Sequence, residues 1–97
     1  MTEKKLKNGW VEGSAQDLLG LSSADMEYIE TRLALSRMLR DLRQKQQLTQ
    51  VQIAARLHTS QSRVAKMEHA DPTVSVDLLL QALFRLGVTR RDLAAAM

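Results

Sequence analysis

A short polar stretch in the second half of the chain carries side chains that can hydrogen-bond to the edges of DNA bases. Lys66 follows Ser62 by four residues and Gln61 by five, so the three side chains are expected on roughly the same face of a helix. A glutamine amide can form two hydrogen bonds with adenine, and a lysine can reach guanine or phosphate. Ser62 belongs to the same face, and Arg63 lies at its flank. The alternative interpretation is an ordinary solvated helix face.

Two short helices joined by a tight turn must position this polar face. Thr49 is a typical N-cap for a helix over residues 48–57, and a second helix is expected over residues 60–69. Ala54 is expected where the two helices cross, because a small side chain lets their backbones approach closely. Four apolar residues at helical spacing are expected to be buried beneath the motif: Ile53, Leu57, Val64 and Met67.

A long helix is expected before this pair, over residues 24–46. Ser22 or Ser23 is placed to act as its N-cap, with Asp25 completing a capping box. Its apolar stripe changes face along the helix, so the first half is expected to face a partner or the N-terminal arm and the second half the core. The Gly- and Ser-containing segment 1–23 is interpreted as that arm.

Two more helices complete the predicted domain. Ser75 is expected to cap a helix over residues 76–86, which Gly87 ends, and Thr89 with Asp92 forms a capping box for the last helix. The chain has few aromatic residues and many Leu and Ala, a composition typical of an all-α interior. We therefore expect an all-α, five-helix domain over residues 24–97, with a motif at about 49–69.

The basic residues are concentrated in the centre of the chain. Residues 38–69 hold six Lys and Arg against two Asp and Glu, whereas residues 1–37 hold five against six and residues 70–97 three against three. A central positive stretch favours phosphate binding through counterion release. An ordinary solvated basic face would give the same distribution.

Several classes of protein are disfavoured by what the sequence lacks. The absence of cysteine excludes disulfides and thiolate metal sites, and no apolar run approaches the roughly 18 residues of a membrane span. His58 and His69 have no carboxylate cluster at ligand spacing, so neither a metal nor another cofactor is expected. The sequence contains neither a nucleophile with a paired base nor a phosphate-binding Gly loop, and this disfavours an enzyme. We expect a cytoplasmic, nucleoid-associated protein with no membrane partner.

The central motif resembles the Xre/Cro-type repressors over about residues 35–93. The residues that carry the resemblance are Arg40-x-x-Arg43, Leu48-Thr49-Gln50-x-x-Ile53-Ala54-x-x-Leu57 and Ser60-Gln61-Ser62-x-Val64-x-x-Met67-Glu68. The resemblance implies a phage-repressor-like helix-turn-helix fold in which Arg43 pairs with Glu68 and Gln50 contacts a phosphate while buttressing Gln61. The expected DNA-contacting set is Gln50, Thr59, Ser60, Gln61, Ser62, Arg63 and Lys66.

Two positions depart from the family pattern. His58 and Ala70 stand where glycine is common, in positions that favour positive φ. Histidine tolerates the left-handed region better than most residues, but alanine there costs roughly 1 kcal/mol. The expectation for residues 70–72 is therefore a loop that takes another course.

Residues 20–36 carry a second likeness, to small antitoxins of the HigA-like kind. It rests on Gly20-Leu21-Ser22 and Glu30-x-Arg32-Leu33-x-Leu35-Ser36. The likeness implies an antitoxin that binds a ribonuclease toxin and, as a homodimer, represses its own operon. Acidic residues of the arm and first helix half would complement a basic partner: Glu12, Asp17, Asp25, Glu27 and Glu30. The alternatives are a free-standing phage-type repressor and a protein-interaction module that has lost DNA binding.

Overall fold

The computed structural model describes residues 19–97, and its regular elements are all helices. They are α2 (Ser23–Lys45), α3 (Gln50–Arg56), α4 (Gln61–Glu68), α5 (Val76–Arg85) and α6 (Arg90–Ala96). These five helices, with no strand in the described range, confirm the expected fold class. No helix among these residues is both long enough and apolar enough to cross a bilayer. Most of the expected arm, residues 1–18, lies outside the described part.

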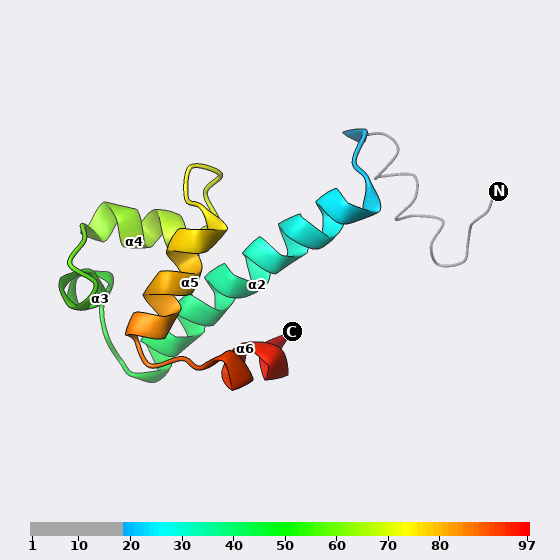
Figure 1. The fold of residues 1–97 in the computed structure, drawn as a ribbon. Helices are drawn as coiled ribbons and strands as arrows, with labels where there is room; N and C mark the ends of the chain where they lie inside the picture. Colours follow the sequence, from blue (N-terminus) through cyan, green and yellow to red (C-terminus); the bar gives the residue numbers. More distant parts are fainter. Residues whose placement is uncertain (1–18) are drawn as a thin grey trace. The chain divides into compact units, whose positions relative to one another are not determined.

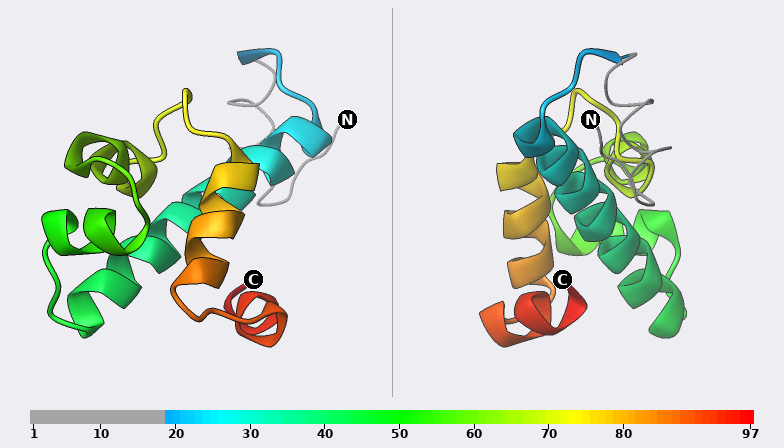
Figure 2. Two further views of the ribbon diagram at one scale, coloured as in Figure 1. Left: turned by 60° about the vertical axis from the view of Figure 1, so that its left-hand side comes forward. Right: turned by 90° about the vertical axis from the view of Figure 1, so that its right-hand side faces the viewer.

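The chain divides into two compact units, Met1–Glu30 and Thr31–Met97. The described part of the first unit contains the start of α2. The second unit holds the remainder of α2 together with α3, α4, α5 and α6 (Figure 1). Within this second unit, α3 and α4 form an adjacent pair, and α5 packs against α2 (Figure 2). All the core residues belong to the second unit.

Each described helix begins at a side-chain cap. Ser22 and Asp25 exchange hydrogen bonds of 3.0 and 3.1 Å between side chain and backbone, which selects Ser22 rather than Ser23 as the first cap. A cap of this kind stabilises a helix by about 1 kcal/mol, because it satisfies an amide that has no partner within the helix. The five N-caps are Ser22, Thr49, Ser60, Ser75 and Thr89.

Left-handed residues end α2, α3 and α4 without glycine. Gln47, His58 and Ala70 have φ values of 59°, 55° and 54°. After each of them, an amide bonds back to a carbonyl five residues earlier, as from Asp71 N to Lys66 O at 3.0 Å. The expectation that the loop at residues 70–72 takes another course is therefore wrong. Ala70 keeps the glycine-like conformation because this hydrogen bond and the following turn fix it.

The core lies between the second half of α2 and the other helices. Eleven apolar residues are buried: Leu35, Leu39, Ile53, Ala54, Leu57, Val64, Met67, Val74, Leu79, Ala82 and Leu83. The four residues expected beneath the motif are all among them, which confirms that prediction. On α2 the apolar stripe is only partly buried, since Ile29 and Leu33 are 38% and 45% exposed. The buried face of α2 instead includes the polar residues Arg32 and Ser36.

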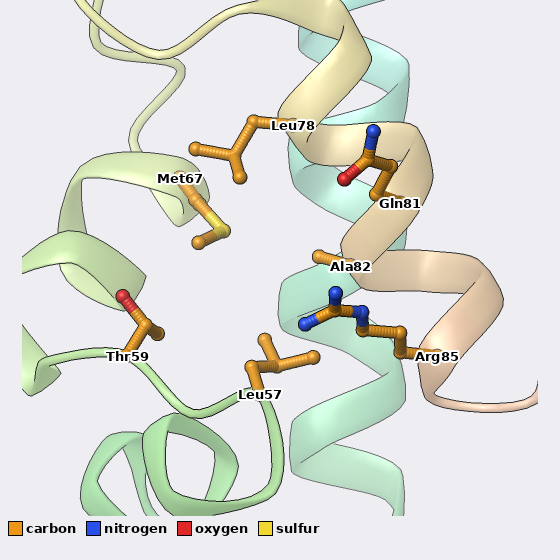
Figure 3. A pocket seen from close by; sticks show the side chains of 7 residues that line it. All are labelled: Leu57, Thr59, Met67, Leu78, Gln81, Ala82 and Arg85. Carbon is orange, nitrogen blue, oxygen red and sulfur yellow. The ribbon is translucent and has the colours of Figure 1, made fainter.

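A small cavity lies between α5 and the α3–α4 pair (Figure 3). Its apolar wall includes Leu57, Met67 and Leu78, and Gln81 and Arg85 of α5 line it as well. Its volume of about 40 Å³ is close to the roughly 30 Å³ that one water molecule occupies in the liquid. The cavity therefore has room for water but lies well below the roughly 300 Å³ at which pockets begin to hold drug-sized ligands.

Candidate nucleic-acid interface

The helices α3 and α4 have the most extensive backbone contact of any helix pair in the described part of the chain. Ala54 on α3 is 4% exposed, and its carbonyl accepts a 2.9 Å hydrogen bond from the backbone amide of Thr59 in the connecting turn. A longer side chain at this position would push the two helices apart. Ala54 and the left-handed residue His58 together make the turn tight enough to set the direction of α4.

The N-terminal end of α4 presents polar side chains to solvent. The Ser60 hydroxyl accepts from the Arg63 amide at 3.2 Å and begins the helix. Exposed side chains follow on the outer surface: Gln61, Ser62, Arg63 and Lys66. Thr59 does not join them, because it is half-buried and its side chain lines the cavity beside α5 (Figure 3). The structure therefore brings together six of the seven expected DNA-contacting residues, Gln50 included.

A chain of side-chain hydrogen bonds links α2, α3 and α4. Arg43 on α2 donates to both carboxylate oxygens of Glu68 on α4, from Nε at 2.6 Å and from Nη2 at 3.0 Å. Gln50 Nε2 donates to Glu68 Oε1 at 3.1 Å. Gln61 Nε2 in turn donates to Gln50 Oε1 at 2.6 Å. The pair and the buttress implied by the resemblance are thus both present in the structure.

The donor and acceptor roles along this series of hydrogen bonds are set by its buried end, the Glu68 carboxylate. A carboxylate paired with arginine offers only acceptors, so Gln50 must turn its Nε2 toward Glu68. Its Oε1 is then left to face Gln61, whose Nε2 must donate. Gln61 keeps one amide hydrogen and its Oε1 free for a ligand. These two groups match the N7 acceptor and the N6 donor that adenine presents in the major groove.

Burial makes the Arg43–Glu68 pair rigid. The Glu68 side chain is 2% exposed and that of Arg43 is 16% exposed. The hydrogen bonds to Glu68 raise the pKa of Arg43 above its usual range, so the guanidinium stays charged. Arg43 Nη1 also donates to Leu48 O at 3.0 Å, which holds the residues just before α3.

Arg32 holds the loop that follows α4, a role that its type and position alone do not reveal. Its Nη1 donates to Val74 O at 2.5 Å and its Nη2 to Asp71 O at 2.6 Å, although the residue is only 9% exposed. A charged residue on the buried face of a helix breaks the apolar periodicity on which the sequence interpretation relied. Arg32 therefore fixes residues 71–74, which lead from α4 into α5.

Two short helices with a tight turn, and an exposed polar end on the second, define a helix-turn-helix protein. A family model described as a helix-turn-helix domain matches residues 18–90. The chain belongs to this helix-turn-helix domain family. The comparisons with curated proteins and with solved structures found no match to this chain. The family is one of DNA-binding regulators.

Proposed function

We propose that this protein is a sequence-specific transcriptional repressor that places the N-terminal end of α4 in the major groove of its operator. The observation that carries the proposal is the hydrogen bond from Gln61 to Gln50, because it orients a free glutamine amide toward solvent with its donor and acceptor already assigned. The amide would contact adenine, and the amide groups at the start of α3 would receive a phosphate. Arg63 and Lys66 would extend the contact along the groove.

The test begins with the DNA sequence that the protein prefers. Selection from a random duplex library with the purified chain is expected to enrich one site, and fluorescence anisotropy then measures affinity for it. Replacing Gln61 by Ala is expected to cost about 1–3 kcal/mol on that site and to relax the preference at one base pair. Gln44→Ala, at an exposed position near the end of α2, is the matched control and is expected to bind as the parent does.

Two results would contradict the proposed function. If no sequence is enriched at any salt concentration, the protein is not a sequence-specific DNA-binding protein. If Gln61→Ala binds the enriched site as tightly as the parent, α4 does not make the base contact. Arg63→Ala should instead weaken binding to all duplexes and flatten the salt dependence by about 0.9 for the phosphate contact that it removes.

The finer assignment within this function is an Xre-type antitoxin that also neutralises a ribonuclease toxin. It is supported by the resemblance of residues 20–36 to HigA-like antitoxins and by the exposed acidic residues Asp25, Glu27 and Glu30. The arm 1–23 with the start of α2 would then bind the toxin, and the domain from residue 24 onward would bind the operator of the operon. Co-expression with the product of the neighbouring gene tests this assignment. A small basic ribonuclease should co-purify and lose its RNA cleavage activity, whereas a free-standing repressor would leave that activity intact.

A homodimer is part of the same proposal, because one such domain covers only half of a two-fold symmetric operator. Exposed apolar side chains near the C-terminus offer a surface for pairing, since Phe84 is 43% and Met97 60% exposed. The enriched site should then be a palindrome with half-site centres about 34 Å apart. Sedimentation of a single chain per operator duplex at saturation would contradict the dimer.

A further inference from the structure

A groove between α2 and the end of α4 is not used by the contacts described so far. It is lined by Leu33, Ser36, Arg37 and Arg40 of α2 and, beyond them, by Glu68, His69 and Ala70. All of these residues belong to the second unit. The volume is about 200 Å³, below the roughly 300 Å³ at which pockets begin to hold drug-sized ligands. The groove therefore suits a small chemical group.

The charge of the groove is positive on balance. Arg37 is exposed and forms no ion pair with another described residue, and Arg40 approaches Asp41 only at 4.0 Å across exposed side chains. The one carboxylate that lines the groove is Glu68, and Arg43 neutralises it with two hydrogen bonds. Two guanidinium groups on one helix surface, three residues apart, attract an anion and match the oxygens of a phosphate.

A buried hydroxyl at the floor of the groove also lacks a partner. Ser36 is 2% exposed, and its Oγ has no hydrogen-bond partner among the described residues. A serine in a helix ordinarily bonds to a backbone carbonyl one turn earlier or faces water, and a buried hydroxyl without a partner costs free energy. An anion seated in the groove that Ser36 lines would offer this hydroxyl an acceptor.

The groove adjoins the helix surface that is proposed to face DNA. His69 follows Ser62 by seven residues, or two turns, so the C-terminal end of that surface forms part of the groove. Glu68, which lines the groove, is also the acceptor that orients Gln50 and, through it, Gln61. When α4 lies in a major groove about 12 Å wide, a sugar-phosphate backbone runs past each border of that groove.

We propose that Arg37 and Arg40 bind a backbone phosphate of the operator in this groove, at the border of the major groove that α4 enters. The proposal rests on the proposed function and adds to it a second, sequence-independent contact from α2. Its role is to fix the depth and tilt of α4, because phosphate contacts set register while base contacts carry sequence. The exposed side chain of Leu33, which lines the same groove, would pack against the deoxyribose next to that phosphate.

The experiment compares DNA binding by Arg37→Ala/Arg40→Ala with binding by Arg90→Ala/Arg91→Ala. The control pair loses the same charge from exposed positions on α6. The groove variant is expected to lose roughly tenfold in affinity, by the same factor on the enriched site and on an unrelated duplex. Its plot of log affinity against log salt should be shallower by about 0.9, the value for one phosphate contact. Circular dichroism checks that both variants keep the fold.

A neutral methylphosphonate, placed at one backbone position at a time, locates the contact. One position at the border of the site should weaken the parent, and the groove variant should be indifferent to that same position. Arg37→Lys/Arg40→Lys should recover most of the salt slope, because the charges remain. Equal losses for the α6 control, or additive losses for variant and methylphosphonate at every position, would overturn the proposal. An unchanged salt slope would also overturn the proposal, and an acidic protein would then be the occupant to test for this groove. A parent that binds no duplex would instead reject the proposed function.

Discussion

Arg43 and Glu68, 25 residues apart on α2 and α4, form a two-point ion pair at the buried end of the only side-chain network that the described residues show reaching Gln61. The pair links α2, which makes no contact with Gln61, to α4, which carries Gln61, and to α3, whose Gln50 bonds to both Glu68 and Gln61. Its carboxylate accepts from Arg43 and Gln50 at once. The pair therefore couples the stability of the domain to the orientation of Gln61.

Replacing Glu68 by Ala should destabilise the domain by about 3–5 kcal/mol, because it leaves the largely enclosed Arg43 charge without its carboxylate. Glu68→Gln should lose less, since it keeps one acceptor in place. Urea unfolding measures both. Asp41→Ala removes an exposed carboxylate that lies 4.0 Å from Arg40 and should change stability by less than about 0.5 kcal/mol. A loss for Glu68→Ala as small as for Asp41→Ala would mean that the pair contributes nothing beyond a surface contact.

The helix starts could be predicted from the sequence, because the chemistry that makes them is local. Each predicted N-cap is one residue whose side chain bonds to an amide three positions later, and the four predicted helix starts were found, with Ser22 chosen over Ser23. The fifth cap, Ser60, follows the same rule but was not predicted. The helix ends could not be predicted equally well. Gln47 takes a left-handed conformation that nothing in its type announces, and Ala70 does so against its own preference.

The left-handed residue after α2 offers a route to higher stability. Gln47 is exposed with a φ of 59°, and a left-handed conformation costs a residue with a Cβ about 1–2 kcal/mol. Gln47→Gly should raise the free energy of unfolding by about 0.5–1 kcal/mol after allowing for the greater freedom of glycine in the unfolded chain. The measurement is thermal melting followed by circular dichroism.

Gln44→Gly is the matched control for this change. Gln44 is exposed within α2, where glycine costs about 1 kcal/mol, so this variant should melt lower than the parent. Shifts of the same sign for the two glycine variants would refute the role of backbone conformation at Gln47.

The capping box of α6 makes part of the stability pH-dependent. Hydrogen bonds from the Thr89 backbone amide, and then from its side chain, hold the pKa of Asp92 below its usual value. Because the folded pKa lies below the unfolded one, the stabilisation is present at neutral pH and is lost as the pH falls through the folded value. Asp92→Asn keeps an acceptor but removes the charge. The parent should therefore melt above this variant at pH 7, and the difference should shrink and disappear as the pH falls through the lowered pKa of Asp92. A constant difference between their melting temperatures across that range would contradict the assignment.

The candidate site was predictable where it repeats a motif and unpredictable where it depends on distant contacts. Gln50 and Gln61 stand at motif positions, so the sequence could nominate both. Arg40 was named only as part of the family motif and Arg37 was only counted among the charges, because nothing in their spacing shows that the end of α4 lies beside them. Arg32 was named only for the likeness to antitoxins, and its contacts with the loop were missed for the same reason, since both carbonyls it contacts lie about 40 residues further along the chain.

Arg32 provides the last test, because its planar guanidinium meets two carbonyls that a lysine cannot reach together. Arg32→Lys should lower the free energy of unfolding by about 1.5–3 kcal/mol, the range for hydrogen bonds to a charged group. The effect should be largest in the loop, where the Val74 amide bonds to Asp71 O at 3.0 Å and Arg32 Nη2 donates to that same oxygen. Hydrogen exchange should therefore accelerate more at Val74 than at the amide of Leu83 in α5. Arg37→Lys, at an exposed position of the same helix, should leave both amides unchanged. Equal acceleration at the two amides would show that Arg32 supports the whole domain rather than holding the loop.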